Sequence, residues 1–315
     1  MIAAALGMAF VLLNGAPAAQ VKADNYADDF LAFWESTASL STADRVKAFK
    51  TQVAVLQPSF YGLARFDGRV TEEQHDAAIA KAIDGFAAIR PEYVAEVKTF
   101  DTDLNRNIAT FKKAFPDFEP NIHIYLLHSL GEMDGGTRDL DGGPALIFGA
   151  DVMARIHKGW HNESAFFHHE LFHVYHKAYL GKCEAIWCGL WMEGLAIHVS
   201  EVLNPDATNA ELLLDRPLGL VPRTQQALTA SLEDLAKALD SEDDDVYADL
   251  FNGGPEKTAL PRRRGYYLGL LVAREISKTH SIQSLAKMSA SEARPLVVKA
   301  VNDLLIEARK SSQPG

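Results

Sequence analysis

The sequence predicts a mainly helical α+β protein, and three observations carry this prediction. Most of the chain has apolar residues at three- and four-residue spacing, which is typical of helices that bury one face. Only two short runs, residues 122–127 and 145–148, are rich in β-forming residues. Neither an internal repeat nor a low-complexity linker interrupts the chain, so we expect one compact unit after the N-terminal segment.

The chain begins with an apolar segment, residues 2–13, that is too short for a comfortable membrane span. Small residues follow it, which predicts a signal peptide over residues 1–18, with cleavage as late as residue 23. The usual positive charge at the start is missing, so an uncleaved anchor is the alternative. We therefore expect a periplasmic or secreted protein, with no stable membrane insertion beyond this segment.

Composition argues against several classes of function. The 315 residues include 31 Lys and Arg against 42 Asp and Glu, a net charge of −11. Without a basic surface to attract phosphate backbones, no nucleic acid partner is expected. Mean hydropathy is −0.08, and no long apolar run follows the N-terminal segment, so a polytopic membrane protein is excluded as well.

An N-terminal helical region is expected over residues 24–115. Thr71, with Glu72 and Glu73 behind it, is typical of a capped helix start, and Pro91 suits the first turn of another helix. The helices expected from apolar spacing and these start signals are 29–34, 43–56, 71–89 and 91–115.

The two β-rich runs flank a glycine-rich segment that contains Gly131, Gly135, Gly136, Gly142 and Gly143. This segment has neither the GxGxxG nor the GxxxxGK[ST] spacing of phosphate-binding loops. We therefore expect a flexible connection between two strands and no phosphate site.

The second region, residues 116–315, contains the two β-rich runs and is expected to be mainly helical after them. The clearest helix covers 162–180, with Asn162 or Ser164 as N-cap and Gly181 as the stop. The acidic run 240–245 lacks the spaced ligands of a calcium loop and is expected to be a solvated loop. Further helices are expected over 190–203, 264–280 and 294–309, with a turn at 252–255.

The two cysteines, Cys183 and Cys188, lie close together in the chain. In an exported protein this spacing favours a small disulfide-closed loop over a redox CxxC pair. Two free thiols are the alternative, and a zinc ligand role is disfavoured.

Chemistry is concentrated at His169, Glu170 and His173, which form an HExxH motif inside the clearest helix. Positions i and i+4 lie one above the other on a helix, so both imidazoles can bind one ion while Glu170 projects beside them. A catalytic zinc takes three protein ligands and keeps one position open. Glu193, on the next expected helix, is placed to supply the third ligand. The three residues together predict a Zn²⁺ site.

This pattern, HExxH followed by Glu193-Gly-Leu-Ala, resembles the gluzincins, the clan of thermolysin-like zinc peptidases. The closer likeness is to bacterial families of predicted zinc-dependent proteases in that clan, which share a Gly-Tyr-Tyr-x-Gly helix like residues 265–269 here. The resemblance covers roughly residues 120–275 at the level of motifs. It implies a zincin-like catalytic core with a small mixed sheet and an HExxH helix.

The resemblance also implies that an extended peptide binds along an edge strand, for which residues 145–149 are the candidate. Thermolysin has an Asp four residues after the ligand Glu that orients a zinc histidine. Here Ile197 stands at that position, so the partner that orients the histidines is not identified.

The activity implied is that of an exported zinc peptidase with His169, His173 and Glu193 as ligands. Glu170 is expected to be the general base for a metal-activated water. Tyr266 or Tyr267 is expected to donate to the oxyanion, with simple packing on the helix as the alternative for both tyrosines.

Other charged residues and histidines near the motif are expected to have no part in the chemistry. The run Arg262, Arg263 and Arg264 is expected to be solvated or paired, with one arginine that holds a peptide carboxylate as the alternative. His168 points about 100° away from His169 and cannot share its ion. The remaining histidines of this region are expected to lie outside the metal: His157, His161, His176 and His198.

Two other functions remain open on the same residues. One is a periplasmic binding or scaffold protein with a structural or vestigial zinc site. The other is a zinc hydrolase of non-peptide amides, which the same groups would serve equally well.

Overall fold

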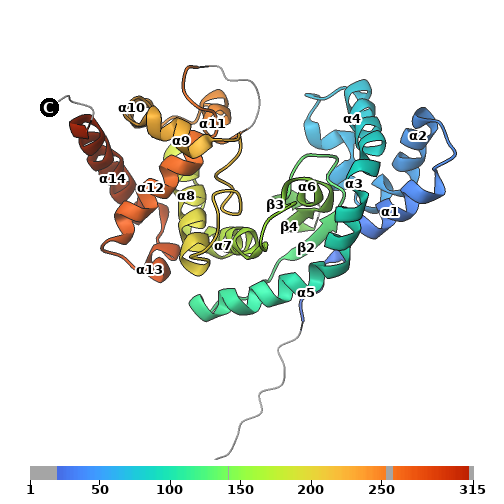
Figure 1. The fold of residues 1–315 in the computed structure, drawn as a ribbon, viewed down its shortest axis with the longest axis horizontal. Helices are drawn as coiled ribbons and strands as arrows, with labels where there is room; N and C mark the ends of the chain where they lie inside the picture. Colours follow the sequence, from blue (N-terminus) through green and yellow to red (C-terminus); the bar gives the residue numbers. More distant parts are fainter. Residues whose placement is uncertain (1–19, 141, 253–257, 312–315) are drawn as a thin grey trace, which may run out of the picture.

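The computed structural model describes residues 20–140, 142–252 and 258–311. The predicted signal peptide, and residues 253–255 of the predicted turn, lie outside this part of the chain. The described residues form a mainly helical α+β fold with one small mixed sheet (Figure 1), which confirms the predicted class.

The sheet has four strands in the order β1-β2-β4-β3. Its two central strands, β2 and β4, run parallel, and β3 runs antiparallel to β4. The strand bounds are β1 Asp24–Asn25, β2 His123–Leu127, β3 Gly135–Leu140 and β4 Gly143–Gly149.

Helices make up most of the rest. Their bounds are α1 Ala27–Ser36, α2 Thr42–Gln52, α3 Pro58–Tyr61, α4 Glu72–Gly85, α5 Arg90–Ala114, α6 Ala150–Ile156, α7 Ser164–Leu180, α8 Ile186–Leu203, α9 Leu220–Gln226, α10 Leu228–Ala238, α11 Asp244–Phe251, α12 Arg264–Ser277, α13 Ile282–Ala286 and α14 Ala290–Ser311.

The expected N-terminal helices are confirmed as α1, α2, α4 and α5. Thr71 caps α4 as predicted: its Oγ1 accepts from the backbone N–H of Gln74, whose side chain accepts from the backbone N–H of Thr71. α5 then runs beneath the sheet and reaches α7 (Figure 1), where Thr110 contacts His168.

The prediction that residues 145–149 form an edge strand is wrong, because these residues belong to β4 in the middle of the sheet. Ala145 to Phe148 are all buried, as is typical of a central strand covered on both faces. The edge strands are the two-residue β1 and β3, Gly135–Leu140, and the sequence suggested the segment of β3 to be a flexible connection. Edge strands are commonly polar and glycine-containing, which hides them from apolar patterns.

The predicted HExxH helix is confirmed as α7. It ends at Gly181, whose φ of 78° is a left-handed conformation that glycine adopts without strain. The next helix, α8, begins at Ile186, four residues before the expected start at Leu190. Cys183 and Cys188 form the predicted disulfide, which closes the connection between α7 and α8.

α8 and α12 cross at two glycines, one from each of the motifs that carry the family resemblance. A methyl group on Gly194 would lie 2.2 Å from the carbonyl carbon of Gly269, so only glycine permits this approach. The close crossing brings the start of α12, with Tyr266, alongside Glu193.

The acidic run is only partly a loop. Asp243 caps a helix, α11, by accepting from the backbone N–H groups of Asp245 and Val246, so the prediction of a solvated loop over 240–245 is wrong for its last two residues. The reason is that a short acidic side chain before an apolar run is itself a helix start signal.

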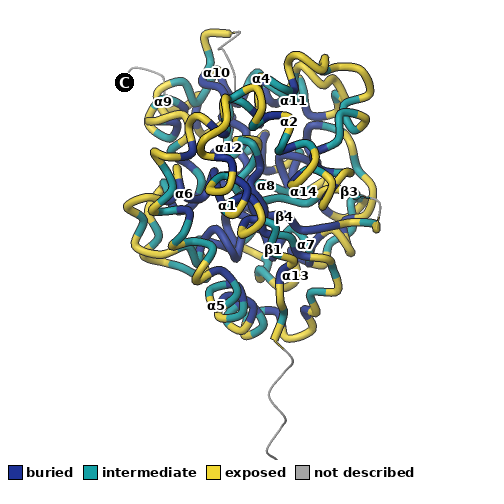
Figure 2. The backbone as a smooth tube through the Cα atoms, turned by 90° about the vertical axis from the view of Figure 1, so that its right-hand side faces the viewer, coloured by how far each residue is buried: buried dark blue, intermediate teal, exposed yellow. Residues whose placement is uncertain are grey.

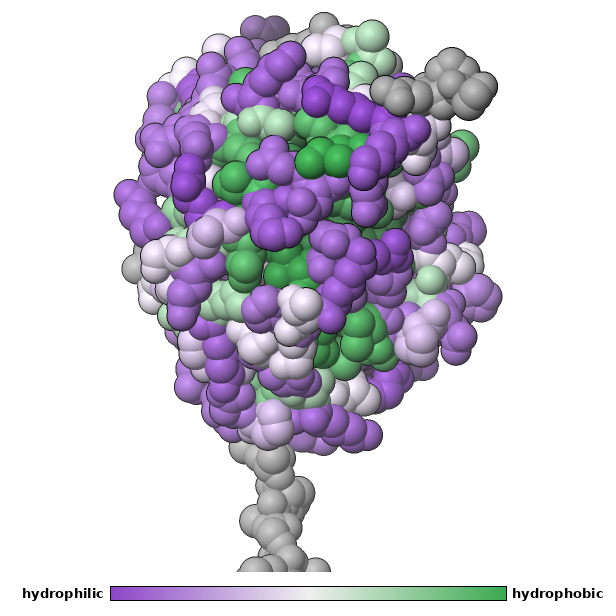
Figure 3. Space-filling model, turned by 90° about the vertical axis from the view of Figure 1, so that its left-hand side faces the viewer, coloured by the Kyte–Doolittle hydropathy of each residue, from purple (hydrophilic) through white to green (hydrophobic). Residues whose placement is uncertain are grey.

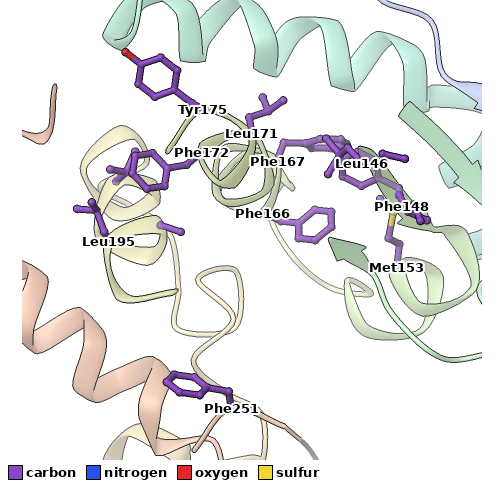
Figure 4. Close-up of a cluster of buried hydrophobic side chains, with 14 of the residues drawn as sticks. Leu146, Phe148, Met153, Phe166, Phe167, Leu171, Phe172, Tyr175, Leu195 and Phe251 are labelled. Atoms are coloured by element: carbon purple, nitrogen blue, oxygen red, sulfur yellow. The ribbon is translucent and has the colours of Figure 1, made fainter. Parts of the chain in front are cut away.

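The main apolar core lies between the sheet, α7 and α8. In Figure 4, apolar side chains of β4, α6 and α7 point towards one another, and Leu195 of α8 faces the same cluster. Buried residues gather at the centre of the molecule, around α8 and β4, while the loops and outer helices are exposed (Figure 2). The core therefore holds α7 in place from both sides.

The face on the α14 side is mostly hydrophilic, with apolar residues visible between polar ones (Figure 3). None of the helices in the described part of the chain is both long and apolar enough to cross a lipid bilayer.

Candidate metal centre

His169, His173 and Glu193 converge on one point between α7 and α8. The two Nε2 atoms lie 2.9 Å apart, and Oε2 of Glu193 lies 3.4 Å from Nε2 of His169 and 3.5 Å from Nε2 of His173. This group can hold a metal ion. The i, i+4 spacing on α7 and the packing of α8 against α7 therefore bring together the three side chains that the sequence predicted as ligands.

The triangle of these three atoms has the size that a zinc site needs. Sides of 2.9, 3.4 and 3.5 Å define a circle of about 1.9 Å radius, so a point just off its plane lies about 2.0 Å from all three atoms. Zinc binds imidazole nitrogen and carboxylate oxygen at about 2.0–2.2 Å. The donor set and its spacing fit Zn²⁺ without any rearrangement.

The charges of the group are strongly coupled. Although burial disfavours a charged carboxylate, the neighbouring His173 and His169 hold the pKa of Glu193 well below its ordinary value. Burial, followed by the proximity of His173, lowers the pKa of His169. The two ring nitrogens that face each other can share one hydrogen bond, or both can turn their lone pairs to one metal ion together with the Glu193 carboxylate.

Glu170 projects beside this group and is buried, with 4% of its surface exposed. Burial raises its pKa to about 8; nearby Asp134 and Glu193 raise it further, while His173 opposes the rise. Oε2 of Glu170 has no hydrogen-bond partner in the described part of the chain. A buried, unpartnered carboxylate next to a candidate metal position is suited to carry protons.

Gly135 on the edge strand lets Glu170 lie there. A methyl group at this position would lie 2.8 Å from both Cγ and Cδ of Glu170 and 2.8 Å from the ring of Phe166. The sequence predicted Gly135 only as part of a flexible connection between two strands. The contact of Gly135 with Glu170 could not be predicted from sequence patterns, because it joins residues of β3 and α7 that lie far apart in the chain.

A cleft of about 750 Å³ opens onto the candidate metal position. In Figure 1, β3 and α6 lie on one side of α7, and α8, α11 and α12 lie on the other. Side chains of both groups line the cleft, which includes His169, Glu170, His173 and Glu193. Ligands and general-base candidate therefore share one solvent-accessible chamber.

The two predicted tyrosines have different places. Tyr266 lines the cleft, and burial together with the charge of Glu193 raises its pKa. Tyr267 is buried in a separate apolar cluster, where its hydroxyl accepts a 2.8 Å hydrogen bond from Gln225. Tyr247 of α11 also lines the cleft, and burial, then Glu193, raises its pKa to about 12. No sequence motif marked Tyr247, because it lies within the segment expected to follow a loop.

The three neighbouring arginines also separate. Arg264 is buried and pairs with Asp249 at 2.6 Å and Asp234 at 2.5 Å. Arg262 is buried and donates to the carbonyl of Ala248. Arg263 alone of the three lines the cleft.

The other histidines have partners away from the candidate metal position. His168 contacts Thr110 and Asn204, at 2.8 and 2.9 Å, and Nδ1 of His176 donates to the carbonyl of Ala286. The remaining three lie near carboxylates, His157 with Glu163 and Asp134, His161 with Glu211, and His198 with Glu201.

Ile197, at the position of the missing Asp, is fully buried in an apolar cluster. Nδ1 of His169 is buried and has no hydrogen-bond partner among the described residues. Asp134, which directly precedes β3, is close enough for its charge to act on His169.

No protein-family model, curated protein or solved structure matches this chain.

Proposed function

We propose that this protein is an exported zinc-dependent peptidase of the gluzincin type. The observation that carries the proposal is the convergence of His169, His173 and Glu193 at zinc-binding distances inside a cleft. Structural zinc sites are usually closed by four protein ligands, whereas three ligands that face a cleft leave a position for reaction chemistry.

Zinc held by His169, His173 and Glu193 would supply a Lewis acid for the scissile carbonyl and would lower the pKa of a bound water to about 7. Glu170 takes the proton from the attacking water and passes it to the leaving amine. Its burial supports this role, because a carboxylate with a raised pKa is a better proton acceptor near neutral pH.

The oxyanion needs a donor besides the metal. Tyr266 and Tyr247 both line the cleft close enough to Glu193 for its charge to raise their pKa values, so both hydroxyls stay protonated and able to donate. Tyr267 is not a candidate for this role, since its hydroxyl faces Gln225.

The edge strand β3 supports an extended peptide as substrate. Residues 135–138 of this strand line the cleft, and the strand is paired only with β4. Its outer edge offers backbone N–H and C=O groups to which a peptide backbone can pair.

The proposal is tested with the full-length protein, stripped of metal by a chelator and reloaded with one equivalent of Zn²⁺. We expect the reloaded protein to cleave members of a mixed peptide library and the stripped protein to cleave none. Mass spectrometry of the products measures both. Zinc binding without cleavage of any peptide would contradict the proposal in favour of a scaffold, and cleavage confined to non-peptide amides would replace the substrate class.

A further inference from the structure

The cleft carries an unexpected pair of positive charges. Arg216, in the segment between α8 and α9, and Arg263, just before α12, both line it together with Glu193 and Tyr266. Burial lowers the pKa of Arg216, the charge of Asp134 opposes this, and the positive charge of Arg263 lowers it further, so the two arginines of the cleft repel each other. Two arginines held together in a chain of net charge −11 need an explanation.

Neither arginine forms an ion pair within the described part of the chain. No carboxylate oxygen of the described residues lies within 4.0 Å of either guanidinium group. This differs from Arg264, which binds two aspartates, and from Arg138, which lines the same cleft and binds Glu132 at 2.7 Å. Arg216 and Arg263 are therefore set apart from the other arginines of this region.

Their protein contacts leave donors for a ligand. Arg216 makes one long hydrogen bond, 3.4 Å from Nη2 to the carbonyl of Ile156. The guanidinium carbon of Arg263 lies 4.6 Å from the ring centre of Tyr266, and its Nε is buried without a hydrogen-bond partner in the described part of the chain. The contact with Tyr266 holds Arg263 in the cleft and leaves some of its five N–H donors for a ligand.

We propose that Arg216 and Arg263 together bind a carboxylate of the substrate beside the candidate metal position. The inference rests on the proposed function and adds to it a substrate class: peptides with a carboxylate close to the bond that is cleaved. A carboxylate between two guanidinium groups relieves their repulsion and accepts paired hydrogen bonds from each. The carboxylate comes either from the C-terminus of the peptide or from an Asp or Glu side chain.

The experiment compares matched peptides on the zinc-loaded full-length protein. One pair differs by a free or amidated C-terminus, and another by Glu or Gln near the cleaved bond. We expect kcat/KM to be at least about tenfold higher for one carboxylate form, since a charge-assisted hydrogen bond contributes about 1.5–3 kcal/mol. The pair that shows the preference identifies the source of the carboxylate.

The variants Arg216→Gln and Arg263→Gln should reduce this preference to within about threefold, whereas Arg138→Gln should keep it, because Arg138 is already paired with Glu132. The ratio between matched peptides corrects for any general loss of activity. A wild-type protein that cleaves charged and neutral peptides equally well would overturn the inference and leave the proposed function intact.

Peptide binding to the Glu170→Gln protein, measured by calorimetry, gives a second readout that does not depend on turnover. The same carboxylate preference is expected in Kd. Equal affinity for both members of each pair would overturn the inference even if no peptide were cleaved, so its failure is separable from failure of the proposed function.

Discussion

Replacing Glu170 by Gln is expected to lower kcat by about 10²–10⁴-fold while zinc stays bound. The amide keeps the size of the side chain but cannot accept the proton of the attacking water. The ligands His169, His173 and Glu193 are untouched. Steady-state kinetics on a cleaved peptide, together with zinc content from elemental analysis, measure the two effects separately.

The matched control is Glu184→Gln, since Glu184 lines the same cleft but is largely exposed and pairs only with Lys182. This variant should keep wild-type kcat. Stability should not confuse the comparison, because burial raises the pKa of Glu170 to about 8, so folding at neutral pH must suppress the ionisation that this carboxyl has in the unfolded chain, and an amide carries no such cost. A fully active Glu170→Gln protein would contradict its role as general base.

Replacing Gly194 by Ala is expected to lower the free energy of unfolding by about 3 kcal/mol, the upper part of the range for overpacked cores. The new methyl group would lie 2.2 and 2.3 Å from the carbonyl carbon and oxygen of Gly269. Backbone atoms cannot rotate away as a side chain does, so α8 and α12 must move apart. Urea unfolding measures the change.

The control for this prediction makes the same chemical change where space is open. Gly85, at the end of α4, has negative φ, and a methyl group there meets no atom within 4 Å. Gly85→Ala should therefore stabilise the protein by about 0.4–1 kcal/mol through a less flexible unfolded chain. Both variants are compared in chelator, which removes any contribution of metal binding. Equal stability of the two variants would refute the close crossing of α8 and α12.

Local signals were sufficient to predict the helix that carries the chemistry. Gly181 ends α7 as predicted, and the placement of His169, Glu170 and His173 follows from i, i+4 geometry within one helix. The Cys183–Cys188 disulfide could also be predicted, because the chain has only two cysteines and they lie close together behind a predicted export signal. These features depend on neighbours in the sequence.

The features that the sequence did not reveal depend on contacts between distant segments. The edge strand β3 is polar and glycine-containing, so its pairing with β4 leaves no alternating apolar pattern. Tyr247 and Arg216 reach the cleft from α11 and from an irregular segment, where no periodicity marks them. The choice between Tyr266 and Tyr267 likewise needed the packing of α12 against α8, which turns only Tyr266 towards Glu193.

The central claim is that one zinc ion binds at three named side chains, and its most direct test is the zinc content of dialysed protein. We expect one zinc per chain in the wild type and in His161→Ala, a control whose side chain is 77% exposed and lies outside the group. His169→Ala, His173→Ala and Glu193→Gln should each lose most of the metal, because two remaining ligands bind zinc far more weakly. A folded wild type without zinc, or full zinc content in all three ligand variants, would contradict the account.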